Sequence, residues 1–360
     1  MTNIIHILED FSFLSGGLRT TVKNLHDRLI ENNIKSTIIT TRKEEEDDVV
    51  LVKGGSTPWR FSINLITKLN ELKAQGKIDI IHIHGVWMYP QYAAAKFSTN
   101  NNIPFLISCH GMYEPWLWLK GGIKKKTYFK YVVKDVFSKA NYIHAITEPE
   151  AKELKRLFFK TKIKVIPNLI DPKRSVAKKS CYKEKYILYL GRIDEKKGID
   201  LLIRAFGTIQ EKGFRLKIAG NDNNYKDVLD KLVKQLNLQT KVDFLGLVIG
   251  EEKELLFKNA FVFIAPSHSE VIGMVNLESA ILGTPVITTF QTGLKKEWAD
   301  NGGILINPTT QEIKNALEMA INWSNDERDK RGNLLSEFVK KEYSWEYKLK
   351  DWIHLYKKLV

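Results

Sequence analysis

The chain has 360 residues, of which 43% are hydrophobic, so it is long enough for two domains of roughly 150 to 200 residues with separate cores. It has no run of 18 or more apolar residues, which excludes a membrane-spanning helix. The N-terminal stretch lacks the pattern of a signal peptide, and two cysteines exclude a disulfide framework, so we expect a reducing, cytoplasmic location.

The net charge is +14, and most of this excess lies between residues 120 and 164, where thirteen Lys or Arg residues accompany four acidic residues. Such a concentration indicates an acidic partner or surface. A basic nucleic-acid-binding protein would also explain the charge, and we keep it as an alternative from another class.

The first part of the chain predicts a strand at residues 4–8, a turn containing Gly16 and Gly17, and a helix over residues 18–33. This order is typical of the phosphate-facing start of a βαβ unit. Two adjacent glycines alone also fit any tight turn. Further strands are expected at 36–40, 78–84, 104–108, 142–145 and 164–166, and helices at 61–72, 92–98 and 148–159.

Two features near the ends of these strands could carry chemistry. His82 and His84 alternate on one face of a strand, but the sequence offers no third ligand at a suitable spacing, so no metal site is expected. We expect His84 to reach the ligand-binding edge of the sheet. His110 follows the next strand in the motif S-x-H-G-M, where it could serve a ligand or cap the next helix.

The segment after this motif mixes aromatic and basic residues, with Trp116 and Trp118 ahead of Lys124, Lys125 and Lys126. Such segments lie in the membrane interface, where each Lys near an anionic surface contributes roughly 1 kcal/mol. We rank an anionic membrane surface or lipid-linked acceptor first, an ordinary solvated surface second and nucleic acid third.

The strand-and-helix pattern restarts after residues 167–185, where the sequence P-N-L-I-D is followed by a polar stretch, and we interpret these residues as an interdomain hinge. A strand at 186–190 leads into a loop with Arg192 and Lys197, then a helix at 199–211. Two cations beside a helix N-terminus suit a diphosphate, although a solvated basic turn would look similar. Lys196 is expected to be a solvated neighbour.

Later strands are expected at 216–219, 242–245 and 304–306, and helices at 226–236, 251–258, 310–323, 327–341 and 343–359. Between them, residues 261–289 read as strand, loop, helix, turn and strand. Glu270 lies in that loop and Glu278 in that helix, with Gly273 between them, where φ is positive or the backbone amide must stay unobstructed.

These motifs together resemble retaining glycosyltransferases of family four. The resemblance rests on Pro266, Ser267, Glu270, Gly273, Glu278, Gly283, Pro285, Val286 and Ile287, on the loop from Gly191 to Gly198, and on S-x-H-G-M. It implies an α/β chain with the GT-B fold, in which two Rossmann-like domains with doubly wound parallel sheets face each other. The boundaries expected are 1–168 for the acceptor side, 169–342 for the nucleotide sugar and 343–360 for a helix that crosses back.

The resemblance also implies roles for individual residues. Arg192 and Lys197 would hold the diphosphate, Glu278 the ribose, and His110 the transferred sugar. The sugar would also meet Glu270 and the amides of Ile272, Gly273 and Met274, and the Gly16–Gly17 turn would complete the site.

The activity implied is retaining transfer of a hexosyl unit from a UDP-sugar or GDP-sugar to a lipid-linked or cell-envelope oligosaccharide. The sequence contains no D-x-D motif, so we expect neither a metal nor another cofactor. We expect an enzyme of bacterial surface-polysaccharide assembly, cytoplasmic and peripheral on the inner membrane face. A GT-B nucleotide-sugar epimerase or a non-catalytic sugar-nucleotide-binding protein would carry similar motifs, and both stay open at this point.

Overall fold

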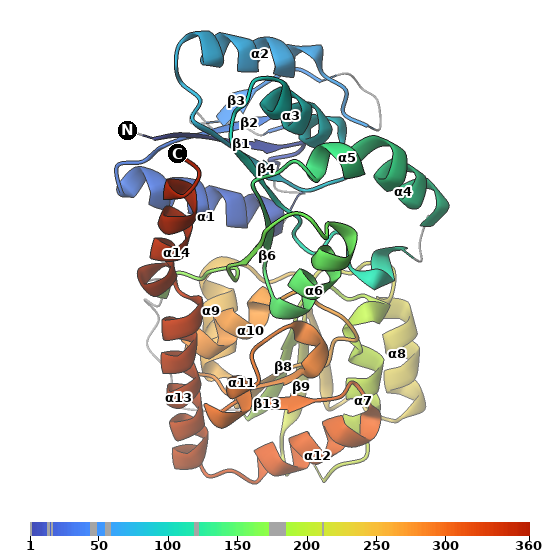
Figure 1. The fold of residues 1–360 in the computed structure, drawn as a ribbon. Helices are drawn as coiled ribbons and strands as arrows, with labels where there is room; N and C mark the ends of the chain where they lie inside the picture. The colour runs from blue at the N-terminus through green and yellow to red at the C-terminus, as the bar shows by residue number, and fades with distance from the viewer. Residues whose placement is uncertain are drawn as a thin grey trace. The chain divides into compact units, whose positions relative to one another are not determined.

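Two parallel β-sheets organise the chain, which is described here from a computed structural model (Figure 1). The structure describes residues 2–12, 15, 17–43, 49–54, 59–118, 122–172, 185–210 and 212–360. One unit consists of Met1–Asn168 together with Leu349–Val360, and the other of Leu169–Lys348. Residues 173–184 of the predicted hinge at 167–185 lie outside the described residues.

The first unit holds a seven-stranded sheet with the strand order β3-β2-β1-β4-β5-β6-β7, all parallel. Its strands are β1 (Asn3–Leu8), β2 (Lys35–Thr40), β3 (Val49–Leu51), β4 (Ile80–His84), β5 (Phe105–Ser108), β6 (Tyr142–Ala145) and β7 (Ile163–Val165). Its helices are α1 (Gly17–Glu31), α2 (Ile63–Ala74), α3 (Tyr89–Asn100), η2 (Pro115–Trp118), α4 (Gly122–Tyr128), η3 (Phe129–Val133), α5 (Lys134–Phe137) and α6 (Glu148–Leu157).

The two faces of this sheet are different in chemistry. Isoleucines at positions 5, 7, 81 and 83 point into an apolar core shared with α2, α3 and α5. Side chains alternate along a strand, so the residues between them face the other way. There His6 and His82 are register partners, and His82 contacts Trp352 and Tyr356 of α14 (Trp345–Lys357). Helix α14 begins in the second unit, and its residues from Leu349 belong to the first.

The second unit holds a six-stranded parallel sheet with the order β10-β9-β8-β11-β12-β13. Its strands are β8 (Tyr186–Leu190), β9 (Arg215–Ala219), β10 (Val242–Gly246), β11 (Val262–Ala265), β12 (Val286–Thr289) and β13 (Ile304–Ile306). Its helices are η5 (Glu195–Lys197), α7 (Ile199–Phe206), α8 (Lys226–Gln235), α9 (Gly250–Asn259), α10 (Met274–Ile281), η6 (Phe290–Thr292), α11 (Glu297–Asp300), α12 (Thr310–Ile321) and α13 (Asn325–Tyr343).

Helices cover both faces of this second sheet, with α7, α8 and α12 packed together and α9, α10 and α13 packed together (Figure 1). Strands β8, β11 and β12 are buried throughout, as expected for parallel strands covered on both sides. Side-chain caps define several helix starts: Thr309 accepts from the Glu312 amide, and Ser324 from the Glu327 amide. The predicted α/β fold class is confirmed.

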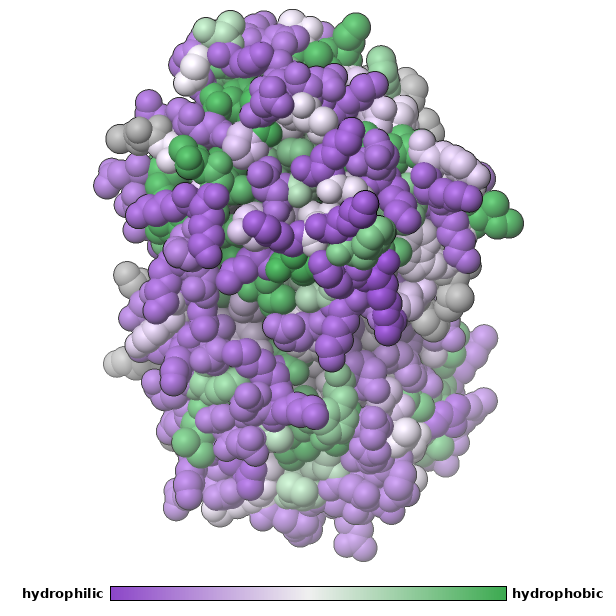
Figure 2. All heavy atoms as spheres, viewed as in Figure 1, coloured by the Kyte–Doolittle hydropathy of each residue, from purple (hydrophilic) through white to green (hydrophobic). Residues whose placement is uncertain are grey.

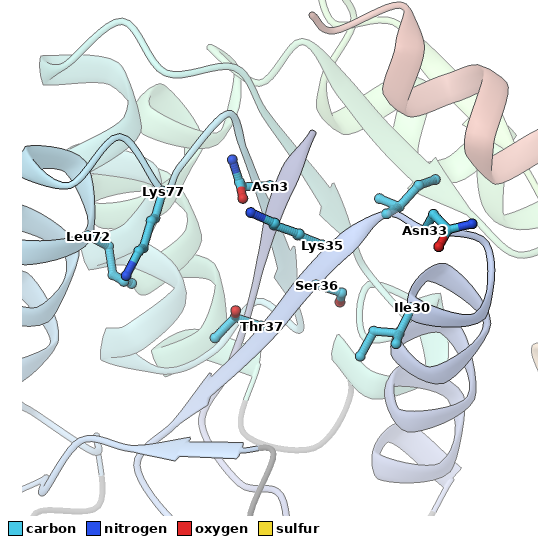
Figure 3. Close-up of a pocket in the computed structure, with 9 residues that line it drawn as sticks. Asn3, Ile30, Asn33, Lys35, Ser36, Thr37, Leu72 and Lys77 are labelled. Carbon is cyan, nitrogen blue, oxygen red and sulfur yellow. The ribbon is translucent and has the colours of Figure 1, made fainter. Parts of the chain in front are cut away.

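The surface adds two observations. Among the described residues, no helix is both long and apolar enough to cross a membrane, and Figure 2 shows a mostly hydrophilic face with small separate apolar areas. A hollow of about 400 Å³ lies at the amino ends of β1 and β2, between Ile30, Lys35, Leu72 and Lys77 (Figure 3). Ligands of open α/β sheets bind beyond the carboxyl ends of the strands, so this hollow is not the candidate site.

Candidate active site

The carboxyl ends of β8 and β11 place two sequence motifs together. These strands are neighbours in the second sheet. The loop after β8 carries Arg192 and Lys197, and the loop after β11 carries Glu270. Because parallel strands end at the same edge, residues 73 positions apart in sequence meet there.

The backbones of these two loops are packed against each other. Gly198 has φ of 65°, and a Cβ atom there would collide with the carbonyl oxygen of Pro266. The His268 amide donates to the carbonyl of Lys196 at 2.9 Å. Only glycine permits both the left-handed conformation and this close approach, which explains the final glycine of the G-R-x-x-x-x-K-G loop.

The side chains of the two loops form an ion pair between Lys197 and Glu270. Their side chains are only 14% and 20% exposed, whereas Arg192 is exposed. The hydroxyl of Tyr189 donates to the carbonyl of Arg192 at 2.9 Å and fixes the start of the loop. One cation is therefore held by a carboxylate and the other extends into solvent at the same edge of the sheet.

Asp194 shapes the loop that carries both cations. It accepts from the Lys196 amide at 3.0 Å and from the side-chain amide of Asn223 at 2.8 Å. Burial favours the protonated acid, but these hydrogen bonds and the nearby cations hold the pKa of Asp194 below its usual value. An ionised Asp194 therefore stabilises the turn at neutral pH.

Helix α10 carries the second carboxylate. Glu278 Oε2 lies 2.7 Å from Lys253 Nζ of α9, a partner that the sequence motifs did not indicate. Gly273, just before the helix, has φ of −77°, so the expectation of a positive φ there is wrong. Glycine is required for space instead, because a Cβ would lie 2.7 Å from Nδ2 of the buried Asn276.

In the first unit, the candidate residue His110 lies two residues beyond the carboxyl end of β5. Its φ is 50° and that of Gly111 is 73°, a left-handed turn that needs support. The carboxylate of Glu150 provides it by accepting from the Gly111 amide at 2.7 Å and the Ile146 amide at 2.6 Å. Burial raises the pKa of Glu150 to about 7, although both hydrogen bonds oppose the shift.

Buried imidazoles extend behind His110. Its Nε2 lies 3.1 Å from Nδ1 of His84, and Nε2 of His84 lies 2.9 Å from Nδ1 of His6. The side chain of His84 contacts His110 and is only 1% exposed. It therefore does not itself reach the ligand-binding edge of the sheet. Burial lowers the pKa of His110 and of His6 to about 3, and that of His84 well below its usual value, so all three are neutral at pH 7.

The same histidines correct one expectation from the sequence. His6 is the third potential metal ligand that the spacing of His82 and His84 did not suggest, because β1 pairs with β4 only in the folded sheet. One ring nitrogen from each of the three lies within 4.8 Å of the others. However, His82 Nδ1 is 2.8 Å from the hydroxyl of Tyr356 and Nε2 is 2.7 Å from that of Ser108. Both nitrogens are thus already used, which disfavours a metal ion.

The structure describes all but one of the remaining predicted site residues. Gly16 lies outside the described residues. Gly17 begins α1, and a Cβ there would meet no atom within 4 Å, so packing in the described chain does not explain that glycine. Ile272 is buried and Met274 begins α10, beside Gly273.

In the basic aromatic segment, two of the residues predicted to face a membrane or acceptor, Trp118 and Lys125, instead make contacts within the first unit. Trp118 packs against Tyr113 and Phe129 in the core, and its Nε1 donates to the carbonyl of Tyr113 at 3.0 Å. Lys125 donates to the carbonyl of Leu117 at 2.6 Å. The side chain of Trp116 lies outside the described residues. The exposed residues of the segment include Ile123, Lys124, Lys126, Lys130, Tyr131 and Lys134, and we call these six the basic surface.

Comparison with known proteins identifies the family. The family described as Glycosyltransferase Family 4 matches residues 15–174, and Glycosyl transferases group 1 matches residues 173–336. The uncharacterized glycosyltransferase MJ1607 of Methanocaldococcus jannaschii is 30% identical over 309 residues, covering 78% of this chain and 75% of that protein. The chain belongs to the family-four glycosyltransferases.

Two further relatives of this glycosyltransferase have named activities. The alpha-monoglucosyldiacylglycerol synthase of Streptococcus pneumoniae is 28% identical over 254 residues, covering 63% of this chain and 55% of the synthase. The O-antigen chain mannosyltransferase RfbU of Salmonella typhimurium is 24% identical over 309 residues, covering 73% of this chain and 86% of RfbU.

Solved structures support the GT-B fold of the glycosyltransferase. Sucrose-phosphate synthase from Thermosynechococcus elongatus superposes with a TM-score of 0.79 at 20% identity, covering 100% of this chain and 99% of that one. HepE of Anabaena, in complex with UDP-glucose, superposes with a TM-score of 0.77 at 14% identity, covering 99% and 100%.

Proposed function

We propose that this glycosyltransferase moves a hexosyl unit from a UDP-sugar or GDP-sugar to a hydroxyl of a lipid-linked or cell-envelope oligosaccharide. The proposal includes retention at the anomeric carbon and independence from metal ions. The observation that carries it is the meeting of Lys197 and Glu270 at the carboxyl edge of the second sheet, with Arg192 exposed in the same loop.

Each residue at this edge has a role that its chemistry supports. The diphosphate leaving group gains negative charge in the transition state, and Arg192 and Lys197 would stabilise that charge. Arg binds an anion through two parallel N–H donors and Lys as a point charge. Their positive charge would take the place of a chelated metal, in keeping with the lack of a D-x-D motif.

The donor sugar and nucleoside would meet the neighbouring groups. Glu278 would accept hydrogen bonds from the ribose hydroxyls, and Glu270 with the backbone amides of residues 272–274 would bind the sugar. Because Glu270 pairs with Lys197, donor binding would draw Lys197 toward phosphate and leave Glu270 available for sugar hydroxyls. His110 would contact the transferred sugar from the first unit.

The class of acceptor is suggested by two kinds of support. The named relatives act in glycolipid and O-antigen synthesis, as their names state. The basic surface presents Ile123 at 85% exposure and Tyr131 at 73%, with exposed lysines beside both. Apolar side chains among lysines suit an anionic lipid surface. We therefore propose a peripheral position on the cytoplasmic face of the membrane.

Donor binding is the first measurement we propose. UDP and GDP are added separately in the presence of EDTA, and thermal unfolding is followed. A nucleotide at about 100 times its dissociation constant should stabilise the protein by roughly 2.7 kcal/mol, and Glu278→Ala should reduce this. Stabilisation that requires Mg²⁺ would contradict metal independence, and no stabilisation by either nucleotide would contradict the donor assignment.

The reaction itself is tested with the UDP-sugar or GDP-sugar of the nucleotide that binds, first without an acceptor and then with lipid-linked oligosaccharides. We expect transfer only with acceptor, and a product anomer of the same configuration as the donor. A new nucleotide sugar formed without acceptor would indicate an epimerase instead. Inversion at the anomeric carbon would overturn the retaining mechanism.

A further inference from the structure

One carbonyl group determines which groups donate and which accept along a chain of hydrogen bonds in the first unit. His144 Nε2 lies 2.7 Å from the carbonyl oxygen of Ile166, which can only accept, so Nε2 carries the proton. Burial lowers the pKa of His144 to about 4, so the ring is neutral and its Nδ1 must accept. The hydroxyl of Ser108, 2.8 Å away, is the donor to it.

The direction continues from Ser108 to the last helix. Since Ser108 donates to His144, its oxygen accepts from Nε2 of His82 at 2.7 Å. His82 is also neutral, because burial holds its pKa well below the usual value. Its Nδ1 therefore accepts from the hydroxyl of Tyr356 at 2.8 Å. His82 and His144 are thus both Nε2–H tautomers.

The second chain joins His110, His84 and His6, and its direction depends on its buried end. Nε2 of His6 is buried and has no hydrogen-bond partner among the described residues. If His110 donates to His84 and His84 donates to His6, Nε2 of His6 carries a hydrogen that has no acceptor. If His6 donates to His84 and His84 donates to His110, the same nitrogen is an acceptor that has no donor. Among buried backbone groups, orphaned N–H groups are rarer than unsatisfied acceptors, and we apply the same order of preference to this ring nitrogen.

We infer that His6, His84 and His110 are all Nδ1–H tautomers, and that His110 offers a hydrogen-bond donor, not a base, to the substrate. In this direction Nδ1 of His6 donates to Nε2 of His84, and Nδ1 of His84 donates to Nε2 of His110. His110 then has Nδ1–H as its remaining polar group. His84 and His6 are positioning residues that hold this tautomer.

The consequence for catalysis rests on the proposed function. A half-buried imidazole that can only donate binds a hydroxyl oxygen of the transferred sugar and orients it. It cannot take the proton of the acceptor hydroxyl, because its basic nitrogen already accepts from His84. The acceptor proton must therefore go to another group.

Nuclear magnetic resonance tests the inference without any assay of transfer. The full chain, labelled with ¹⁵N at its eight histidines, is examined at pH 7 by long-range ¹H–¹⁵N correlation, which distinguishes the two tautomers of each ring. Single His→Gln variants assign the signals. We expect Nδ1–H for residues 6, 84 and 110 and Nε2–H for 82 and 144. An Nε2–H or a doubly protonated His110 would overturn the inference.

Two substitutions at one position then test the positioning role. In His84→Asn the amide nitrogen lies close to the place of Nδ1 and can still donate to His110. In His84→Gln it lies close to the place of Nε2, and the donor to His110 is lost. We expect kcat to fall roughly tenfold or more in His84→Gln with KM little changed, and to stay within about threefold in His84→Asn.

His354→Gln serves as the control, because His354 is an exposed histidine of the same unit, on α14. It should leave both kcat and the His110 tautomer unchanged. Equal losses of kcat in the Gln and Asn variants of His84 would overturn the positioning role. If the tautomers are as expected but the wild type transfers no sugar, the proposed function fails and the tautomer assignment stands.

Discussion

The candidate site residues of the two units lie in different electrostatic surroundings. In the second unit, Arg192, Lys197, Glu270 and Glu278 lie partly exposed at the carboxyl edge of the sheet, and three of them, Lys197, Glu270 and Glu278, belong to ion pairs. In the first unit, His110 stands in front of imidazoles that are fully buried and neutral. One unit therefore offers charge, and the other offers oriented hydrogen bonds.

The difference follows from the cost of desolvation. Charges near solvent lose little hydration and can respond to a polyanionic ligand, as a diphosphate would require. Buried histidines are stable only as neutral rings with matched donors and acceptors, so they fix direction and position. The contrast predicts that the first unit is sensitive to acid and the second to removal of charge.

The largest effect is expected from removing a charge in the second unit. Lys197→Ala should lower kcat by roughly 10² to 10³, because a preorganised group facing the leaving diphosphate is lost. Its neighbour provides the matched control: Lys196→Ala removes the same charge one residue away and should change kcat less than about threefold. Equal losses in both variants would show that only the overall charge of the loop matters.

Acid should unfold the first unit before the second. Unfolded histidine titrates near 6.5, and His6, His110 and His144 titrate at about 3 to 4 when folded, so stability is lost as pH falls below 6.5. At pH 5 each contributes a loss of about 2 kcal/mol. Glu150 acts in the opposite sense: its folded pKa of about 7 makes the fold more stable as pH falls from 7 to about 4.5. Burial also raises the pKa of Glu9 in this unit, but two carboxyl groups do not offset several histidines.

Hydrogen–deuterium exchange at pH 7.5 and pH 5.0 measures this difference. Peptides from β4 and β5 should exchange faster at pH 5.0 after correction for the intrinsic rate, and peptides from β8 and β11 should not. In the second unit the lowered pKa of Asp194 and of Asp243 costs stability only as pH falls through about 4. Equal acceleration in both units would remove the distinction between them.

The smallest effect is expected from removing the hydroxyl of Tyr356, the last donor in the hydrogen-bond chain that contains His82 and His144. Tyr356→Phe removes the donor to His82 and leaves a buried acceptor, which should cost about 1 to 2 kcal/mol. For a unit of this size each kcal/mol lowers the melting temperature by roughly 2 to 4 °C in calorimetry. Tyr347 lies in the same helix and is 43% exposed, so Tyr347→Phe should have no effect. An unchanged melting temperature for Tyr356→Phe would contradict a stabilising hydrogen bond between Tyr356 and His82.

Much of the fold could be predicted because buried parallel strands leave long apolar runs between amphipathic helices. The strand at 186–190 and the closing strand at 304–306 were predicted with the bounds observed. β3 was not predicted, since three residues next to an acidic run carry too little pattern. Observed helix ends also differ from the predicted ones: α3 begins at Tyr89, three residues earlier than predicted, with Pro90 in its first turn.

Site residues could be predicted only where residues close together in the sequence form a recognisable motif. Arg192 with Lys197, and Glu270 with Glu278, are each recognised by short spacing. The support for His110 was not, because His6, His84 and Glu150 come from three other elements and meet it only after the sheet forms. The sequence signal for His6 and His84 was a polar residue inside an apolar strand, a pattern that singled out His84 but not His6, and Glu150 in α6 had no such signal.

The contact between Tyr356 and His82 also bears on how the protein is made. The ribosome synthesises the first 168 residues early, yet the donor to His82 arrives 188 residues later. At about 5 to 20 residues per second this delay is roughly 10 to 40 s. During that time the nascent first unit holds an incomplete polar chain against an uncovered face of its sheet. A chain that stalls before residue 356 would leave this face without its covering helix and open to aggregation.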